Sequence, residues 1–271
     1  MATILVDQDL CTRCGICSTV CRASIIDPPD ENTLPKVQDI NADKCMKCGH
    51  CEVFCPTYAL QNILAGKGTP LPADAGFIPS RDLEIYLKKR RSVRNFTNDP
   101  VPKEKIEQVL DIARYAASIG NSQPVQWLIV RDPNTVHRFA ELTIDWMMTL
   151  KNNSHPLSGY APSSIAAWEA GRDSICNGSP HLVIAHIPED NPYAIVNAII
   201  SLTHFDIAAP AFGIGTCWAG ILSAAVDAYE PLQKALKLPA GRKYAYSILF
   251  GYPQYKPYGI PSRNPVQVTY Y

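Results

Sequence analysis

CTRCGICSTVC, residues 11–21, and CMKCGHCEVFC, residues 45–55, share one cysteine spacing, C-x2-C-x2-C-x3-C. Together they hold eight of the ten cysteines in this 271-residue chain. Bacterial proteins use this spacing to hold iron–sulfur clusters on a loop and one turn of helix. The two runs therefore predict two [4Fe–4S] clusters, and electron transfer as the role of this part of the chain.

The fourth cysteine of each run is expected to cross over to the other cluster. The first cluster then takes Cys11, Cys14, Cys17 and Cys55, and the second takes Cys45, Cys48, Cys51 and Cys21. Structural zinc is the first rival, but it needs only four ligands, usually as two separated C-x2-C pairs. Disulfides are the second, but they suit small secreted domains. The opening MATILVDQDL lacks the basic region and apolar stretch of a secretory signal, so we expect reduced thiols in a reducing cytoplasm.

Composition limits what the rest of the chain can be. The chain is longer than one cluster-binding module, so a second domain must follow. Net charge is zero, and the single basic cluster, KKRRSVR at residues 88–94, has no second one to support a nucleic-acid surface. The longest apolar stretch, 194–211, is interrupted by Asn197, His204 and Asp206 before it reaches the ~18 residues that span a bilayer. We expect neither a nucleic-acid nor a membrane partner.

The chain is expected to form a cluster domain at 1–66, a linker at 67–79 rich in Gly and Pro, and a second domain at 80–271. In the second domain, hydrophobic periodicity predicts helices at 82–89, 102–120, 135–150, 193–212 and 232–236, and strands at 126–130, 182–187 and 246–250. The apolar 193–212 helix suits a buried core or a subunit interface. Strands separated by helices indicate an α+β or layered second domain.

Four short stretches of the second domain could carry chemistry. Arg90-Arg91-Ser92-Val93-Arg94 offers guanidiniums and a hydroxyl to a phosphate, although a solvated basic face has the same composition. ASIGNSQPVQW, residues 117–127, presents Asn121 and Gln123 on a turn, as a ligand-reading loop or a plain helix end would. GIGTCWAG, residues 213–220, permits close backbone approach to a flat ligand. Arg263 adds an isolated charge near the C-terminus.

In this order the four stretches resemble the nitroreductase family of FMN-dependent oxidoreductases, and the cysteine runs resemble a clostridial-type two-cluster ferredoxin. The family signature R-[RH]-S-x-[RK]-x-F is matched by Arg90, Arg91, Ser92, Arg94 and Phe96. N-[SA]-Q-P-W-x-F is matched by Asn121 to Pro124, with Val125 and Trp127 in place of the aromatic pair. G-x-G-T-C-W-x-G matches residues 213–220, and Ser262 with Arg263 matches a late phosphate contact. The resemblance covers residues 80–271. One departure lies in the ferredoxin part, where Arg22 rather than proline follows Cys21.

The resemblance implies a fold, a cofactor and site residues. The fold is α+β, with a ferredoxin-like two-cluster domain followed by an α-β-α layered domain that forms intertwined homodimers with FMN at the interface. Arg90, Arg91, Ser92 and Arg263 would hold the FMN phosphate. Arg94, Asn121 and Gln123 would face the ribityl chain and pyrimidine edge, and the backbone of Cys217, Trp218, Ala219 and Gly220 would border the ring. No catalytic side chain is implied, because the flavin carries the chemistry.

The combined prediction is an FMN-dependent oxidoreductase in which two [4Fe–4S] clusters relay electrons to FMN. The substrate would be an electrophilic small molecule, such as a nitroaromatic, quinone or enone. An external ferredoxin, another redox protein or NAD(P)H would supply the electrons. Two alternatives stay open at this point: a dehydrogenase that exports electrons through the clusters, and a non-enzymatic redox relay or sensor.

Overall fold

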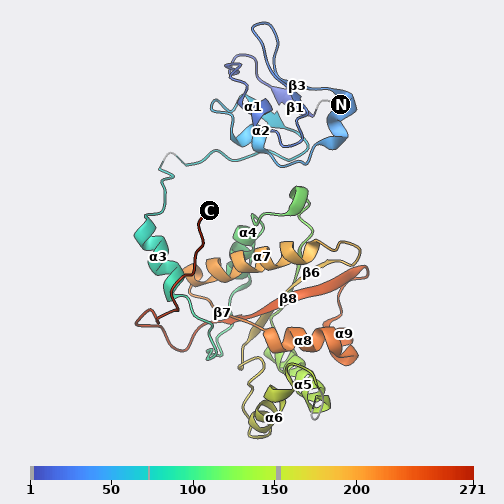
Figure 1. The fold of residues 1–271 in the computed structure, drawn as a ribbon, viewed down its shortest axis with the longest axis vertical. Helices are drawn as coiled ribbons and strands as arrows, with labels where there is room; N and C mark the ends of the chain where they lie inside the picture. The colour runs from blue at the N-terminus through green and yellow to red at the C-terminus, as the bar shows by residue number, and fades with distance from the viewer. Residues whose placement is uncertain (1–2, 73, 151–153) are drawn as a thin grey trace. The chain divides into compact units, whose positions relative to one another are not determined.

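The computed structural model describes residues 3–72, 74–150 and 154–271. The chain divides into two compact units, Met1–Phe77 with Gly120–Ser122, and Ile78–Ile119 with Gln123–Tyr271 (Figure 1). The division at Phe77 falls inside the stretch expected to be a linker. Each unit has its own hydrophobic core.

The N-terminal unit is built from two similar halves. Its elements are β1 (Ile4–Val6), α1 (Ile16–Thr19), β2 (Ile26–Asp27), β3 (Lys36–Val37), the 3-10 helix η1 (Asp39–Lys44), α2 (His50–Val53) and β4 (Leu60–Asn62). β1 pairs antiparallel with β4, and β2 with β3. The two short helices each follow a glycine in the left-handed region, Gly15 at φ 74° and Gly49 at φ 72°. Such a turn is open to glycine at no steric cost, and it leads into the short helix that carries the third cysteine of each run, Cys17 or Cys51.

The second unit is a four-stranded antiparallel sheet covered by helices on both faces. The strand order is β5 (Gln126–Val130), β6 (His181–Pro188), β8 (Arg242–Gly251) and β7 (Gly215–Trp218). The helices are α3 (Ser80–Lys89), α4 (Lys103–Ala113), η2 (Ile119–Asn121), α5 (Pro133–Thr149), η3 (Ser158–Tyr160), α6 (Ala161–Glu169), α7 (Ala194–Ala208), η4 (Ala209–Phe212), α8 (Gly220–Ala228) and α9 (Glu230–Leu236). The expected α+β class and α-β-α layering are confirmed.

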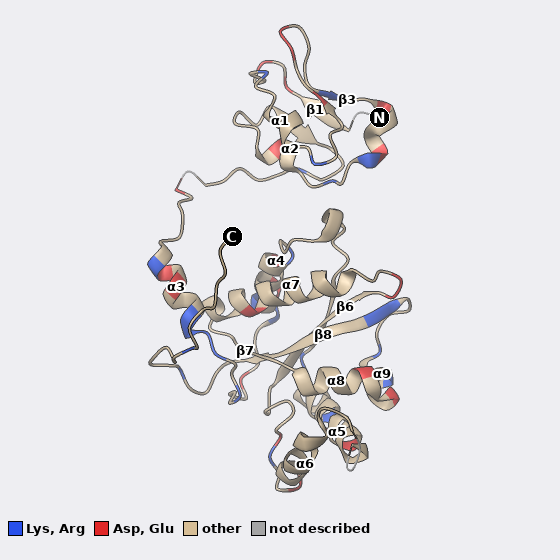
Figure 2. Ribbon diagram, in the orientation of Figure 1, with Lys and Arg blue, Asp and Glu red and all other residues tan. Residues whose placement is uncertain are grey.

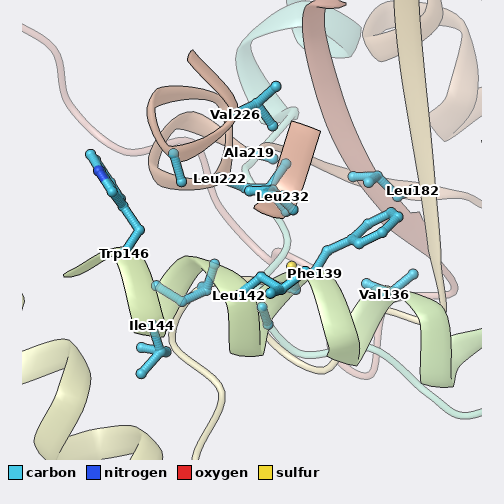
Figure 3. Packing of buried hydrophobic residues seen from close by; sticks show 14 of the residues in the cluster. Val136, Phe139, Leu142, Ile144, Trp146, Leu182, Ala219, Leu222, Val226 and Leu232 are labelled. Carbon is cyan, nitrogen blue, oxygen red and sulfur yellow. The ribbon is translucent and has the colours of Figure 1, made fainter. Parts of the chain in front are cut away.

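The central strand β6 explains the layering. Its side chains alternate between two cores, because successive residues of a strand point to opposite faces. Leu182 and Ile184 pack with α5, α8 and α9, as Figure 3 shows for Leu182 beside Phe139 of α5. Val183 and Ala185 pack with α4 and α7 on the other face. A strand buried on both faces reads as a continuous apolar run, which is why LVIAHI was recognisable in the sequence.

Several boundaries differ from those expected. α4 begins directly after Pro102 but ends at Ala113 rather than near Gly120. α5 begins at Pro133 because the Asp132 carboxylate caps it, accepting hydrogen bonds from the backbone of Asn134 and Thr135. The sequence patterns gave no signal for α6, α8 or β7. The 193–212 helix is interrupted at Pro210, where α7 gives way to η4.

Among the described residues, one stretch is long and apolar enough to cross a membrane, Ala194–Phe212, with a mean hydropathy of 1.4. The expectation that no such stretch exists was therefore too strict. The same composition is found in core helices, and α7 packs against α4, β6 and β8. Its sheet-facing side, with Leu202 and Phe205 fully buried, belongs to the core of the second unit.

Candidate functional site

The eight cysteines of the N-terminal unit line two separate cavities. One is lined by Cys11, Cys14, Cys17 and Cys55, and the other by Cys21, Cys45, Cys48 and Cys51. The structure thus gathers the thiols in the two crossed groups that the spacing implies. Within the described residues, no three Cys, His, Asp or Glu side chains converge closely enough to hold a single metal ion. Four sulfurs around a cavity suit a multi-iron cluster better than one zinc ion.

The thiols of each cavity influence one another electrostatically. Burial, followed by the charges of the neighbouring Cys48, Cys21 and Cys45, raises the pKa of Cys51 to about 11, against the lowering effect of a hydrogen bond from Asn62. Burial likewise raises the pKa of Cys17. Thiolates gathered around one cavity repel one another, and the iron of a cluster would offset that negative charge. The donor chemistry of both cavities fits [4Fe–4S] clusters.

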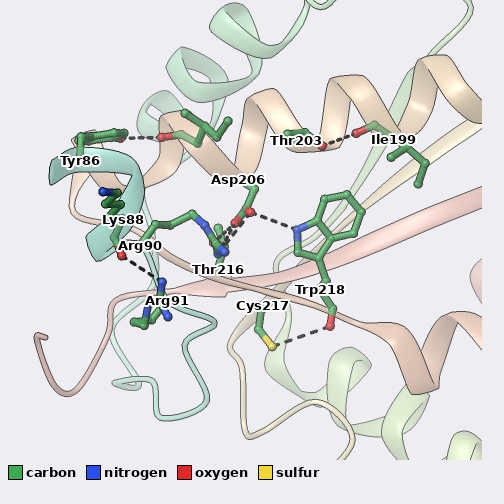
Figure 4. Close-up of polar contacts among 11 residues, drawn as sticks. Tyr86, Lys88, Arg90, Arg91, Ile199, Thr203, Asp206, Thr216, Cys217 and Trp218 are labelled. Atoms are coloured by element: carbon green, nitrogen blue, oxygen red, sulfur yellow. Dashed lines mark hydrogen bonds and ion pairs between the residues drawn. The ribbon is translucent and has the colours of Figure 1, made fainter. Parts of the chain in front are cut away.

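Three arginines of the second unit, Arg90, Arg91 and Arg263, lie close enough to influence one another electrostatically. Arg91 is the second residue after α3, and one of its terminal nitrogens donates to the Lys88 carbonyl at 3.0 Å (Figure 4). Its Nε is buried and, among the described residues, has no hydrogen-bond partner. Burial lowers the pKa of Arg91, and the positive charges of Arg263 and Arg90 lower it further. A buried unpaired N–H beside two like charges is the arrangement that a bound phosphate would complete.

Arg90 has a different environment from its neighbour. Its guanidinium pairs with Asp206 of α7 at 3.4 Å. The same carboxylate, only 5% exposed, also accepts hydrogen bonds from the Thr216 hydroxyl and from Trp218 Nε1 at 3.1 Å (Figure 4). Asp206 is the one charged residue of α7, which is otherwise uncharged along its length (Figure 2). The role of Asp206 was not predicted from the sequence, although a lone acid on an apolar helix is a recognisable signal.

The first and third of the four sequence motifs, residues 90–94 and 213–220, lie against each other. Ser92 forms an isolated parallel β-bridge with Thr216 of β7. The Val93 backbone N–H donates a hydrogen bond to the Thr216 carbonyl at 2.8 Å. The approach requires glycine at 215, since a Cβ there would lie 2.6 Å from Val93 Cγ2. Burial raises the pKa of Cys217, while the positive charge of Arg94 and a hydrogen bond from Ser92 lower it. Motifs more than 120 residues apart in the chain therefore form one surface.

Strand β8 holds the segment Cys217–Gly220 of the third motif through a backbone hydrogen bond and a ring contact. The Ala219 N–H donates to the Ser247 carbonyl at 3.1 Å, and the Trp218 ring lies 5.3 Å from that of Tyr246. Gly220 opens α8, and a Cβ there would meet the Tyr246 hydroxyl at 3.3 Å. These contacts hold the Cys217–Gly220 segment in place against β8.

The second motif is divided between the units. Gly120, Asn121 and Gln123 all have positive φ, at 59°, 54° and 45°. The Gln123 N–H donates to Ser118 Oγ at 3.0 Å. Asn121 groups with the N-terminal unit, where its side-chain amide donates to the Met46 and Lys47 carbonyls at 3.1 and 3.0 Å. Non-glycine residues in this backbone region are uncommon and concentrate at functional sites.

An unexpected arginine anchors the end of this loop. Arg242 of β8 donates to the Pro124 carbonyl at 2.8 Å and to the His186 carbonyl at 2.7 Å. Its Nε also donates to His186 Nδ1 at 3.0 Å, so His186 is an acceptor there. Burial, and then the charge of Arg242, lowers the pKa of His186. The neutral imidazole is thus part of the structure that positions the Gln123 turn.

A polar cleft of about 910 Å³ opens beside Arg94. Its walls come from the first turn of α5, from α6, and from the loop at 171–179. His137 and Arg172 contribute cationic or ionisable groups, and Asp173 contributes a carboxylate. Among the candidate flavin residues, Arg94 lines this cleft, and its positive charge also lowers the pKa of Cys217. The cleft is large enough for a small-molecule substrate.

Two sequence families match the chain. Residues 87–252 match the Nitroreductase family, and residues 10–60 match the 4Fe-4S dicluster domain. The 5,6-dimethylbenzimidazole synthase of Rhodospirillum rubrum is 28% identical over 193 residues, which cover 66% of this chain and 86% of that protein. Iodotyrosine deiodinase 1 of Sus scrofa is 41% identical over 64 residues, only 23% of this chain and 22% of that protein. An NADH dehydrogenase of Thermus thermophilus is 38% identical over 64 residues, covering 24% and 31%.

Solved structures with the same fold contain FMN. A nitroreductase with bound FMN from Desulfitobacterium hafniense has a TM-score of 0.56 and 20% identity, covering 71% of this chain and 100% of that one. Iodotyrosine deiodinase bound to FMN and 3-iodo-L-tyrosine has a TM-score of 0.55 and 21% identity, covering 70% and 98%. At these identities the likeness shows a shared fold.

Proposed function

Because the chain belongs to the nitroreductase family and is therefore an FMN-dependent oxidoreductase, we propose that its two [4Fe–4S] clusters relay electrons to FMN. The flavin would then reduce an electrophilic small molecule, such as a nitroaromatic, a quinone or an enone. The observation that carries this proposal is the presence, on one chain, of two four-cysteine cavities and of an anion site with an unpaired guanidinium nitrogen. Fusion of a donor and an acceptor raises their effective concentration, so that electron transfer needs no separate encounter.

The residues that would hold the FMN phosphate are Arg91 and Arg263, with Arg90 and Ser92 beside them. Arg91 Nε supplies the unpaired donor, and Asp206 holds Arg90 in place. We assign Arg94 and Gln123 to the ribityl chain and pyrimidine edge, and the Cys217–Gly220 backbone to the ring. Bound FMN accepts single electrons and delivers a pair to a substrate. The part of Arg94 is to place a fixed positive charge where reduction develops negative charge.

The cleft beside Arg94 is the proposed entry for the electron acceptor. Its polar walls suit a compact, polar electrophile. The relatives are named as a synthase, a deiodinase and an NADH dehydrogenase. Because these names differ, they support a proposal about the class of substrate rather than about one compound. We propose that NAD(P)H, a ferredoxin or another redox protein is the electron donor.

A homodimer is proposed on the exposed apolar side of α7. Ile195, Val196 and Ile207 lie exposed on this helix, although its opposite side is buried in the core. Sedimentation at several protein concentrations tests the assembly.

Cysteine-ligated clusters also support a reducing cytoplasm as the compartment.

Anaerobic stopped-flow spectroscopy tests the relay. The fully loaded protein is reduced with dithionite or reduced ferredoxin, then mixed with a nitroaromatic, a quinone or an enone. We expect the flavin and cluster absorbance to return together as the acceptor is reduced. In Cys14→Ala, which removes a proposed ligand of the first cluster, delivery from reduced ferredoxin to the flavin should slow by at least tenfold.

Cys176→Ala is the matched control, because Cys176 is buried in the core of the second unit, outside both runs. It should transfer electrons as the parent protein does. If no acceptor reoxidises the reduced protein, the reductase proposal fails. Reduction of the clusters by a substrate added to oxidised protein would instead identify a dehydrogenase, and flavin reduction with no turnover in either direction would identify a relay or sensor.

A further inference from the structure

A polar side chain is buried where strand β4 should contribute an apolar one. β4 alternates, with Leu60 and Asn62 both buried and Gln61 between them half-buried. Asn62 is 2% exposed and pairs in register with Ile4 of β1, inside the small core of the N-terminal unit. A buried amide needs hydrogen-bond partners, and those of Asn62 show its role.

The orientation of the Asn62 amide is fixed by its neighbours. Its Oδ1 accepts a hydrogen bond from the Leu64 N–H at 3.0 Å, so the NH₂ group must be on the opposite side. From there Nδ2 donates to Cys45 Sγ at 3.6 Å and to Cys51 Sγ at 3.8 Å. Both sulfurs line the same cavity. One amide thus reaches two of the four sulfurs proposed to hold one cluster.

The backbone around Asn62 is held as firmly as the side chain. Its N–H donates to Glu52 Oε2 at 3.2 Å, and Glu52 Oε1 accepts from the Gly68 N–H at 2.7 Å. Glu52 is itself buried, at 6% exposure, and follows Cys51 on α2. The carboxylate therefore clamps the end of β4 to the helix that carries a cluster ligand.

The other cavity receives a side-chain donor from the same segment. The Thr57 hydroxyl lies 3.7 Å from Cys55 Sγ. A cysteine that ligates iron has no proton, so the hydroxyl must be the donor. Thr57 and Asn62, five residues apart, therefore serve different cavities.

We propose that Asn62 is a redox-tuning residue that raises the reduction potential of the cluster held by Cys21, Cys45, Cys48 and Cys51, independently of the other cluster. Hydrogen bonds to cluster sulfurs stabilise the added negative charge of the reduced state. Thr57 has the equivalent effect on the cluster of Cys55. The inference rests on the proposed ligand sets, and it extends the proposed function by assigning separate control to each cluster.

A redox titration of the whole protein tests the proposal, with each cluster followed by electron paramagnetic resonance. In Asn62→Leu, one of the two cluster transitions should fall by about 59 mV, a tenfold change in the reduction equilibrium of a one-electron couple. The other transition should not move. Thr57→Val is the matched control and should lower the transition that Asn62→Leu leaves in place.

Asn62→Leu could fail to assemble its cluster, so a second measurement is made on the unmutated sequence. With ¹⁵N only in asparagine side chains, pulsed electron paramagnetic resonance should show a nitrogen coupling to one reduced cluster. Unchanged transitions in a fully loaded Asn62→Leu protein, or the absence of that coupling, would overturn the proposal. A shift of the same transition by both variants would overturn the ligand sets. None of these readouts requires substrate turnover, so a failure of the reductase proposal would be seen separately.

Discussion

Arg90 and Arg91 are adjacent in the sequence but have different partners in the structure. Arg90 pairs with the buried carboxylate of Asp206, whereas Arg91 keeps a buried Nε without a partner among the described residues. Arg263 lies close enough for its charge to lower the pKa of Arg91. Arg90 is therefore held by a carboxylate, and Arg91 is the arginine that we propose for the FMN phosphate.

Arg91→Ala should weaken FMN binding by about 10- to 100-fold, because a hydrogen bond to a charged group contributes ~1.5–3 kcal/mol. Fluorescence titration of the flavin-free protein measures the dissociation constant. Arg138→Ala is the control, since Arg138 is exposed and pairs with Glu141 on its own helix. An unchanged dissociation constant in Arg91→Ala would remove Arg91 from the phosphate site.

At the scale of the elements, strand β7 lies in the 213–220 motif and contacts the arginine-rich motif at residues 90–94. Gly215→Ala should lower the free energy of unfolding of the second unit by about 1–3 kcal/mol, as overpacking does, because the new Cβ meets Val93. Gly159→Ala is the control, since a Cβ at 159 meets nothing within 4 Å. Tryptophan fluorescence follows this unit alone, as all four tryptophans (Trp127, Trp146, Trp168 and Trp218) belong to it. Equal stability of the two variants would contradict the close approach.

His181 connects three elements of the second unit. It begins β6, its Nε2 accepts from the Val101 N–H at 2.9 Å, and its Nδ1 lies 3.1 Å from the Arg131 carbonyl. Nε2 can accept only in the neutral form, so Nδ1 must carry the proton. Burial is the main cause that lowers the pKa of His181.

A lowered histidine pKa makes stability depend on pH. The unfolded chain takes up protons below about pH 6.5 while folded His181 resists them, so the unfolding free energy should be full above that pH and fall as the pH drops. Denaturant unfolding followed by tryptophan fluorescence at pH 7.5 and 5.5 measures the loss. His181→Gln, which keeps a donor and an acceptor, should reduce the loss, whereas exposed His137→Gln should not. Identical pH profiles for all three proteins would contradict this role.

At the scale of the whole molecule, the two units have very different cores. Among the described residues, the hydrophobic core of the N-terminal unit contains six buried side chains that pack together: Ile4, Cys17, Ile25, Ile26, Cys51 and Leu60. Two of the six are proposed cluster ligands. Small folds of this kind depend on a metal site for their stability, since binding free energy becomes folding free energy.

Removal of iron with a chelator should therefore unfold the N-terminal unit and leave the second unit folded. We expect rapid proteolysis within residues 3–72 and an unchanged tryptophan unfolding transition. Protein reconstituted with iron and sulfide is the control and should regain its protease resistance. A protease-resistant N-terminal unit after complete iron removal would show that its core is sufficient without clusters.

Much of the fold and part of the candidate site could be predicted because their signals are local. β6 was recognisable because burial on both faces gives a continuous apolar run. α8 and β7 were not, because the glycines and small residues of 213–220 carry no clear period. Asn62 and Arg242 gave no signal, since their partners Cys51 and Pro124 are distant in the chain.

The sequence by itself determined the cofactor classes and the order of the motifs. Cysteine spacing acts within one loop and one helical turn, so C-x2-C-x2-C-x3-C indicates a cluster without knowledge of the fold. Only the tertiary structure decided which of two adjacent arginines faces Asp206, and which has a buried Nε with no partner among the described residues. It also decided that an asparagine reaches two cluster sulfurs. Such proximities arise from strand pairing and helix packing between distant segments, which no local pattern encodes.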